Sequence, residues 1–385
     1  MFNLRRDYLK KAICKKGLRA VLLDSPSNLY YYTGFTGGEA IFVMPVDNGQ
    51  GSGYIITDSR YYEQVERECS ELKLIRLEKK DYSTTVKELL EELGMLGKFQ
   101  SDGLSGIATE KERNEKAAAK VGIAIEASMS LSRYLKLCKS CGESLFQVED
   151  ELIQESRMVK DEEELAKIAK AEAIGDAAFS YILDVIKPGM TEAEVALELE
   201  FFMKRQGASK LSFDTIVASG SNSSMPHAQV TDRKLEYGDF ITMDFGCVYQ
   251  GYCSDMTRTV ALGTPSGEMR KVYQIVLDAN LRAMEGIRAG VECSAVDALA
   301  RDYIAEQGYG EYFGHGLGHS VGLEIHEEPR FSPKCKVVTK ENMVITDEPG
   351  IYLPGQFGVR IEDLVVVKKD GCECLSHSPK ELIIL

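Results

Sequence analysis

The sequence predicts two domains: an α/β domain over residues 1–150 and an α+β domain over residues 151–385 that contains a duplicated unit of two helices and two strands. A chain of 385 residues, 44% of them hydrophobic, can bury two ordinary cores. Before residue 150, short apolar runs alternate with helical patterns, whereas longer helical patterns follow it. One segment also recurs within the second domain.

The first domain is expected to place short buried strands between helices. The runs RAVLLD, AIFVMP, GYIIT and LKLIRL are short and apolar, which is typical of buried strands. Helical patterns occupy SRYYEQVERE, STTVKELLEELG and ATEKERNEKAAAKVG. The start of the chain, MFNLRRDYLKKAICKKGL, contains Asp7 and lacks an apolar core of about 7–15 residues, so it predicts an amphipathic helix rather than a signal peptide.

The second domain begins with a long amphipathic helix. Apolar residues recur every three or four positions over 165–185, and the pair Pro188 and Gly189 ends the pattern. Thr191 and Glu194 then have the spacing of a capping box, which predicts the start of another helix.

An internal repeat suggests that the second domain is duplicated. The segment KPGMTEAEVALELEFFMKRQG (187–207) resembles RAGVECSAVDALARDYIAEQG (288–308), and each is followed by strand-like segments that contain acids. The alternative is that two amphipathic helices with glycine stops are alike by accident. The aligned residues, at a constant offset of 101 positions, are Gly189, Val195 and Gly207 with Gly290, Val296 and Gly308.

The first unit of the repeat presents a pair of aspartates. DFITMDFGCVYQGYCSDMTRTVAL predicts two strands joined near Gly251. If Tyr249 and Gln250 form the loop, Asp244 lies directly opposite Asp255. Two like charges at that position destabilise a sheet, and a bound cation is the simplest remedy.

The second unit presents a pair of glutamates. In MVITDEPGIYLPGQFGVRIEDLVVV, a turn around Gly355 places Glu348 opposite Glu362. A single acid at the end of a strand more often faces solvent, but pseudo-twofold packing of the two units would bring both pairs together. Four carboxylates and an imidazole suit two divalent ions roughly 3.5–4 Å apart.

Histidines are concentrated beside the second acid pair. The chain has five histidines, and three of them, His315, His319 and His326, lie in GHGLGHSVGLEIHEEP. This density indicates a chemical site rather than scattered surface residues.

The acids and one histidine resemble the metal centre of a known family. The order Asp244, Asp255, His319, Glu348 and Glu362, in the contexts MDFG, YCSDMTRT, GHSVGLEIHE, DEPGIY and VRIED, resembles the five-ligand dinuclear centre of the pita-bread metallopeptidases. That family contains methionine aminopeptidase, aminopeptidase P, prolidase and creatinase. SPSNLYYYTGF and TDSRYYEQ resemble the additional amino-terminal domain of the last three. The resemblance covers nearly the whole chain and implies a creatinase/prolidase-like domain over 1–150 and a pita-bread catalytic domain over 151–385.

The resemblance implies roles for the site residues. The five residues in that order match metal ligands, and Glu348 also matches the proton shuttle between the attacking water and the leaving nitrogen. His326 and His227 match histidines that contact the substrate and stabilise the developing oxyanion. His315 matches a position near the substrate pocket, so only His377 is expected to lie on the surface.

Two arginines and one departure from the family pattern complete the expected site. Arg330 matches a position at which some prolidases bind the carboxylate of a dipeptide through two parallel hydrogen bonds; alternatively, it pairs with Glu328 or faces solvent. Arg360 is expected to orient Glu362. Asp347 stands where the family usually has an apolar residue. Because side chains alternate along a strand, its side chain is expected on the face opposite to that of Glu348.

The implied activity is hydrolysis by a hydroxide that bridges two metal ions. The amino-terminal domain favours cleavage of Xaa-Pro bonds over removal of methionine. An Xaa-Pro aminopeptidase is the main prediction, and an Xaa-Pro dipeptidase (prolidase) is the alternative because of Arg330. Carboxylate-rich ligation favours manganese, with cobalt, zinc and iron as alternatives. Peptide substrates and a homodimer are also implied.

The sequence disfavours three other functions. GHSVG has the form of a nucleophile elbow at Ser320, but the residues that follow do not predict the required helix. A non-catalytic binding module on the same fold is disfavoured because all five ligand positions hold suitable residues. Metal-free chemistry of the creatinase kind is disfavoured because four uncompensated carboxylates would repel one another.

The composition also disfavours nucleic-acid binding and insertion into a membrane. The net charge is −14, and no Lys/Arg run forms the basic surface that phosphate backbones or anionic lipids require, which disfavours nucleic acid and anionic membranes as partners. No run approaches the ~18 apolar residues of a membrane span, so we expect a soluble cytoplasmic protein. Its ten cysteines are then expected to be mostly reduced. The CxxC pair Cys138 and Cys141 lacks a second pair and is interpreted as two unpaired thiols.

Overall fold

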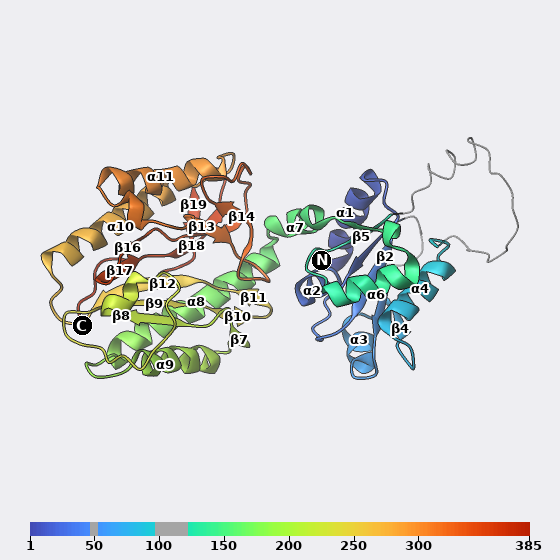
Figure 1. The fold of residues 1–385 in the computed structure, drawn as a ribbon, viewed down its shortest axis with the longest axis horizontal. Coiled ribbons are helices and arrows are strands. Elements are labelled where there is room, and N and C mark those ends of the chain that lie inside the picture. The colour runs from blue at the N-terminus through green and yellow to red at the C-terminus, as the bar shows by residue number, and fades with distance from the viewer. Residues whose placement is uncertain (47–52, 97–121) are drawn as a thin grey trace, which may run out of the picture. The chain divides into compact units, whose positions relative to one another are not determined.

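The computed structural model describes residues 1–46, 53–96 and 122–385 (Figure 1). The chain divides into two compact units, Met1–Ser156 and Arg157–Leu385. The helix expected at ATEKERNEKAAAKVG lies, except for its last residue, outside the described residues. Among the described residues, no helix is long and apolar enough to cross a membrane.

A mixed sheet forms the centre of the first unit. Its described strands are β1 (Ala20–Leu23), β2 (Ile41–Pro45), β3 (Tyr54–Thr57), β4 (Lys73–Arg76), β5 (Ile123–Ile125) and β6 (Phe146–Val148). Their order across the sheet is β4-β3-β2-β1-β5-β6, with β1 antiparallel to β2 and parallel to β5. The four apolar runs are confirmed as β1 to β4. Every residue of β1 and β2 is buried, which explains why these strands are continuously apolar.

Helices accompany this sheet in sequence. The described ones are α1 (Phe2–Lys15), α2 (Pro26–Thr33), α3 (Tyr62–Glu68), α4 (Tyr82–Glu92), α6 (Leu131–Cys141) and α7 (Asp150–Met158), which crosses the division between the units. The basic start of the chain is therefore helical, as predicted. Local chemistry sets the ends of α2: Ser25 caps its first turn, Pro26 takes the first helical position, and Gly34 ends it with φ of 79°.

The second unit contains two equivalent helix pairs. They are α8 (Glu162–Val185) with α9 (Glu192–Arg205), and α10 (Gly267–Gly286) with α11 (Cys293–Glu306). Thr191 and Glu194 form the predicted capping box at α9. Gly189 and Gly290 precede α9 and α11 with φ of 89° and 88°, and both helices have 14 residues. The repeat in the sequence is therefore a repeat in the structure.

The strands of the second unit form four described sheets. The strands are β7 (Lys210–Leu211), β8 (Ile216–Ser219), β9 (Phe240–Phe245), β10 (Cys247–Tyr249), β11 (Tyr252–Cys253), β12 (Met256–Ala261), β13 (Gly318–Ser320), β14 (Glu327–Phe331), β15 (Val344–Asp347), β16 (Gly350–Leu353), β17 (Phe357–Arg360), β18 (Asp363–Val367) and β19 (Cys372–Cys374). Their orders are β12-β9-β8, β11-β10-β7, β14-β13-β15-β18-β19 and β16-β17. Figure 1 shows α8 and α9 beside the strands of the first half, and α10 and α11 beside those of the second.

Each half of the second unit buries an apolar cluster of its own. Ile174 and Ile182 of α8 pack with Met243 of β9 in the first half. Val276 of α10 packs with Ile345 of β15 in the second. The second cluster also includes Phe240 of β9 and Ala261 of β12, so it joins the two halves.

The register expected for the first hairpin is wrong by two residues. Tyr249 pairs with Tyr252, so the turn consists of Gln250 and Gly251, and Asp244 faces Thr257 rather than Asp255. Gln250 and Gly251 both have positive φ, 48° and 90°, as a type I′ turn requires, and the glycine supplies one of these conformations without strain. The two aspartates are consequently diagonal neighbours on one face of the ribbon.

The second hairpin has the expected register. Leu353 pairs with Phe357 across the predicted turn, and Gly350 pairs with Arg360. Asp347 pairs with Asp363 in the adjoining ladder of β15 and β18. Glu348 and Glu362 lie between these two ladders. Continuing the same register places the two residues opposite each other.

Candidate metal centre

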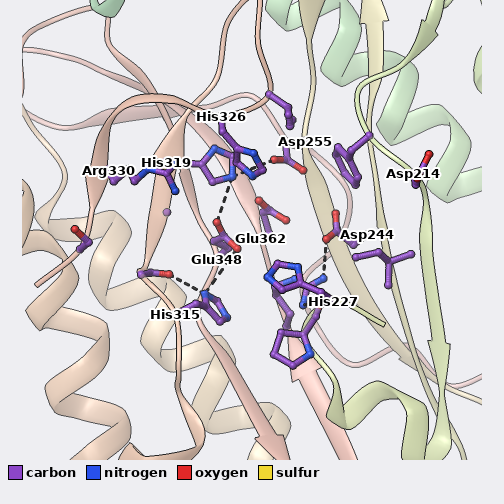
Figure 2. Close-up of a pocket in the computed structure, with 18 residues that line it drawn as sticks. Asp214, His227, Asp244, Asp255, His315, His319, His326, Arg330, Glu348 and Glu362 are labelled. Carbon is purple, nitrogen blue, oxygen red and sulfur yellow. Dashed lines mark hydrogen bonds and ion pairs between the residues drawn. The ribbon is translucent and has the colours of Figure 1, made fainter. Parts of the chain in front are cut away.

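A cavity of about 600 Å³ in the second unit collects the predicted site (Figure 2). It draws on both halves of the duplicated unit. His377 is exposed and does not line it, as expected. All ten predicted site residues line the cavity: His227, Asp244, Asp255, His315, His319, His326, Arg330, Glu348, Arg360 and Glu362.

His319 lies between acids of the two halves. Its Nε2 atom is 3.5 Å from Oδ2 of Asp255 and 3.5 Å from Oε1 of Glu348. One donor atom each from Asp255, His319 and Glu362 lie within 4.8 Å of one another. All three side chains are buried. The duplicated halves thus place aspartate, glutamate and imidazole donors around one point.

Arg360 connects the acid pairs through hydrogen bonds. Its Nη2 donates to Oδ2 of Asp244 at 2.7 Å, and its Nε donates to Oγ1 of Thr257 at 3.0 Å. The Thr257 hydroxyl in turn donates to Oε2 of Glu362 at 2.6 Å. Arg360 therefore contacts Asp244 directly and reaches Glu362 through Thr257, whereas the sequence suggested only Glu362. The guanidinium also donates from Nη1 to the hydroxyl of Tyr352 at 2.9 Å.

The acids are crowded and buried, so their charged forms are costly. Burial, followed by the charges of Glu362 and Asp244, raises the pKa of Asp255 well above its ordinary value. Burial, followed by the charge of Glu348, does the same to the pKa of Glu362. Burial raises the pKa of Glu348 to about 8, although Arg360 opposes the shift. Oδ1 of Asp244 is buried and has no hydrogen-bond partner among the described residues.

These features fit divalent cations. A cation would remove the repulsion between the carboxylates and would give the free oxygen of Asp244 a partner. Carboxylates with one imidazole form a hard to borderline donor set, which suits such ions.

Two histidines of the cavity, His315 and His319, are neutral at physiological pH. Burial lowers the pKa of His319 to about 3 and that of His315 to about 4. Nδ1 of His319 lies 3.2 Å from the Ser320 carbonyl oxygen, which requires the proton on Nδ1 and leaves the Nε2 lone pair for a metal. His315 lies between the Gly316 carbonyl oxygen, 2.8 Å from its Nδ1, and the Tyr352 hydroxyl, 2.9 Å from its Nε2.

His326 and Arg330 lie on the side of the cavity formed by β13 and β14 (Figure 2). The rings of His319 and His326 meet edge to face with centroids 4.5 Å apart. The Arg330 side chain is 50% exposed, and its Nε lies 3.3 Å from Oε1 of Glu328. Arg330 therefore lines the cavity and pairs with Glu328, as the alternative expected, whereas binding of a substrate carboxylate stays a prediction.

Ser320 does not form a nucleophile elbow. It ends β13, and the chain continues through residues 321–326 into β14 rather than into a helix. Its hydroxyl is buried and has no hydrogen-bond partner among the described residues. The structure therefore excludes the triad geometry that a serine hydrolase requires.

Asp347 has an unusual environment next to Glu348. It is buried, does not line the cavity, and neither carboxylate oxygen has a hydrogen-bond partner within the described part of the chain. Burial, followed by the charge of Asp363, raises its pKa well above the ordinary value. The expectation that its side chain turns away from the cavity agrees with this position.

Sequence reasoning missed several residues around the site. Glu172 of α8 is fully buried, and its Oε2 accepts a hydrogen bond from the backbone nitrogen of Asp255 at 3.2 Å. A signal was present, because Glu172 falls within the apolar stripe of a helix, where charges are rare unless paired. Tyr352 and the cavity residues Phe213, Asp214, Ile216 and Ile325 gave no comparable signal.

Comparisons with known proteins find matches in both units of the chain. The model of metallopeptidase family M24 matches residues 166–369, and that of the creatinase/prolidase N-terminal domain matches residues 5–159. The chain is 36% identical to the Xaa-Pro dipeptidase of Pyrococcus furiosus, over 98% of this chain and 99% of the relative.

Solved structures resemble it along their whole length. The Xaa-Pro dipeptidase from Bacillus anthracis has a TM-score of 0.90 at 38% identity, with all of both chains covered. The X-Pro aminopeptidase from Thermotoga maritima has a TM-score of 0.84 at 37% identity, with 99% of both chains covered.

Proposed function

The chain belongs to metallopeptidase family M24 and is a metal-dependent peptidase with a pita-bread catalytic fold; from this premise we propose that it hydrolyses Xaa-Pro dipeptides. The observation that carries the choice of a dipeptide is the position of Arg330. Its guanidinium borders the cavity that contains the acid cluster, where it can hold a terminal carboxylate. An Xaa-Pro aminopeptidase is the second candidate, supported by the likeness to the Thermotoga maritima enzyme.

The acid cluster would hold two divalent ions. We propose Asp244, Asp255, His319, Glu348 and Glu362 as the ligands, because they line one cavity, their carboxylates repel one another, and His319 has an available imidazole nitrogen. Two such ions, when bound, would lower the pKa of a coordinated water toward about 7 and would polarise the scissile carbonyl. Carboxylate-rich ligation supports manganese among the candidate metals.

Residues of this chain perform the remaining steps. Glu348 takes the proton from the attacking water on a carboxylate oxygen and delivers it to the proline nitrogen as the bond breaks. His326 donates a hydrogen bond from its imidazole to the substrate carbonyl oxygen, which gains negative charge in the transition state, and His227 contacts the substrate beside it. Burial lowers the pKa of His326, and a neutral imidazole can still donate one hydrogen bond.

His315 and Arg360 support this arrangement rather than reacting. Arg360 fixes the carboxylate of Asp244, and Tyr352 joins Arg360 to His315. The imino nitrogen of proline has no N–H in a peptide, so the pocket recognises the ring by shape. Phe213 and Ile325 provide apolar surface within the cavity for this purpose.

The wider biological setting is proposed from the same resemblance. The first domain, expected over residues 1–150, is a creatinase/prolidase-like domain, and residues 151–385 form the catalytic domain. We propose a cytoplasmic homodimer. The ten cysteines are compatible with a reducing compartment, since those in the described residues are all free.

The test compares Xaa-Pro dipeptides with Xaa-Pro-Xaa tripeptides and with dipeptides that lack proline, after the chelated enzyme is reloaded with single metals. Faster turnover of Xaa-Pro dipeptides is expected. Arg330→Ala should reduce kcat/KM for dipeptides more than for tripeptides, whereas Lys334→Ala, an exposed charge on the same segment outside the cavity, should affect neither. Comparable hydrolysis of peptides without proline would refute the assignment.

A further inference from the structure

We propose that Glu192 is a positioning residue: its carboxylate closes the loop of residues 219–231 and so holds His227 at the metal centre. This inference rests on the proposed function of the cavity. Glu192 is the first residue of α9, lies outside the cavity lining, and is fully buried. A buried carboxylate is costly unless hydrogen bonds compensate it, so its partners indicate its purpose.

The two oxygens of Glu192 hold the two ends of the loop. Oε1 accepts hydrogen bonds from the backbone nitrogen and the hydroxyl of Ser219, both at 2.7 Å. Oε2 accepts from the backbone nitrogen of Thr231 at 3.1 Å and from its hydroxyl at 2.6 Å. The amide of Asn222 donates to Oε1 at 3.1 Å and to Oε2 at 3.2 Å. One side chain therefore fixes the entrance and the exit of the loop.

The middle of the loop is fixed against β17. Oγ of Ser223 accepts a hydrogen bond from the backbone nitrogen of Gly358 at 2.9 Å. A Cβ atom at Gly358 would lie 2.1 Å from the Ser223 carbonyl oxygen, so only glycine permits this approach. Nη1 of Arg360 donates to the carbonyl oxygen of Pro226 at 3.3 Å, and Nη2 of the same guanidinium binds Asp244.

These contacts determine where His227 lies. Pro226 and His227 both line the cavity, directly after the segment that packs on β17. In Figure 2, His227 lies below Asp244, across the cavity from Arg330. If an end of the loop is released, the loop gains freedom at the residues that form this wall, and His227 no longer keeps one position relative to Asp244.

The fold itself does not require a carboxylate at this position. The duplicated half of the unit places Cys293 where the first half has Glu192, at the same offset that aligns Gly189 with Gly290. Helix α11 starts normally from that cysteine. Glu192 is therefore not part of the shared architecture, and the loop that it holds provides a cavity histidine.

The variant Glu192→Gln removes the negative charge and keeps the shape of the side chain. A glutamine keeps one carbonyl oxygen but presents an NH₂ group to the other end of the loop. The backbone N–H of Ser219 or of Thr231 cannot turn away from that group, so one end must lose its bond. Glu194→Gln on the same helix turn is the control, because Glu194 is exposed and bonds only Thr191 among the contacts found for it.

A double-mutant cycle on the manganese enzyme tests the link to His227. Glu192→Gln should lower kcat/KM for an Xaa-Pro dipeptide about tenfold in the wild-type background and less than about twofold in the His227→Ala background, since coupled residues are not additive. Thr231→Val, which removes one hydrogen-bond donor and keeps the shape of the side chain, should also lower kcat/KM, but by a smaller factor. An equal factor in both backgrounds would show that Glu192 acts independently of His227 and would overturn the proposal.

A second measurement does not depend on turnover. The five histidines can be followed by NMR through their Cε1–H signals, and His227→Ala identifies the signal of His227. Glu192→Gln should shift or broaden that signal and leave the signal of His377 in place, while Glu194→Gln changes neither. An unchanged His227 signal would contradict the positioning role even if the enzyme proved to act on other peptides.

Discussion

Arg360 and Asp244 form a part-buried ion pair, with Nη2 of the arginine 2.7 Å from Oδ2 of the aspartate. The pair leaves the other oxygen of Asp244 without a partner among the described residues, and Asp244 lines the cavity. Arginine therefore fixes the carboxylate in a single orientation and leaves one oxygen for a metal.

Replacing Arg360 should weaken metal binding. Arg360→Lys keeps the positive charge but cannot bind Asp244, Thr257 and Tyr352 together, because it lacks the planar fork of guanidinium. We expect the Kd for manganese, measured by calorimetry, to rise about 10–100-fold, the range found when partners of metal ligands are removed. An unchanged Kd would show that Arg360 does not orient the ligands.

Metal removal should destabilise the protein because the carboxylates then repel one another. Addition of manganese to the chelated enzyme at about 100 times its Kd should raise the free energy of unfolding by about 2.7 kcal/mol. Glu362→Gln should make the chelated protein at least as stable as the chelated wild type, because one buried charge is removed. Manganese should not raise the free energy of unfolding of this variant. Urea unfolding monitored by circular dichroism measures both.

The buried ion pair of Glu327 predicts a pH-dependent stability. Burial alone would raise its pKa, but Arg157 and Lys160 outweigh burial and lower the pKa to about 2. A lowered folded-state pKa means that this stabilisation is present above the unfolded value of 4.5 and is lost as the pH falls toward 2.

Glu327→Gln should therefore destabilise the chelated protein at pH 7 by about 3–5 kcal/mol, because the buried cations Arg157 and Lys160 both lose the charge of Glu327, although Arg157 keeps Glu324. The difference from wild type should shrink between pH 4.5 and pH 2. Urea unfolding at a series of pH values checks this, and a difference that does not depend on pH would contradict the charge interaction.

Two glycines near the metal centre should respond differently to alanine. A Cβ at Gly318, next to His319, would lie 1.9 Å from the Thr346 carbonyl oxygen, so Gly318→Ala must displace β13 from β15. We expect a loss of about 3 kcal/mol in the free energy of unfolding, with weaker manganese binding. At Gly314, no atom lies within 4 Å of such a Cβ. Gly314→Ala should therefore be neutral or stabilise by about 0.4–1 kcal/mol.

The sequence predicted the helices and the metal cluster because these depend on local or repeated patterns. The capping box at Thr191 and the 101-residue repeat are local signals, and the structure confirms both. The register of the first hairpin was wrong because the choice between Tyr249–Gln250 and Gln250–Gly251 as the turn depends on φ at a non-glycine residue. A shift of the turn by one residue moves every cross-strand partner by two.

The supporting residues could not be predicted because their partners are distant in the chain. Glu192 bonds Ser219 and Thr231, and Glu172 bonds the backbone of Asp255. Neither contact leaves a pattern in the sequence beyond a glutamate in a helix. Their importance depends on how the tertiary structure brings α8 and α9 to the loops of the cavity.

The duplicated unit has a consequence for the sequences of its two halves. Each half contributes only one acid pair, and a lone half would expose both charges at an open edge with no opposing donors. One half of the second unit alone would need to self-associate across a twofold axis to bring two acid pairs together. Because both halves are on one chain, they can differ in sequence, and here one supplies aspartates and the other glutamates with an imidazole.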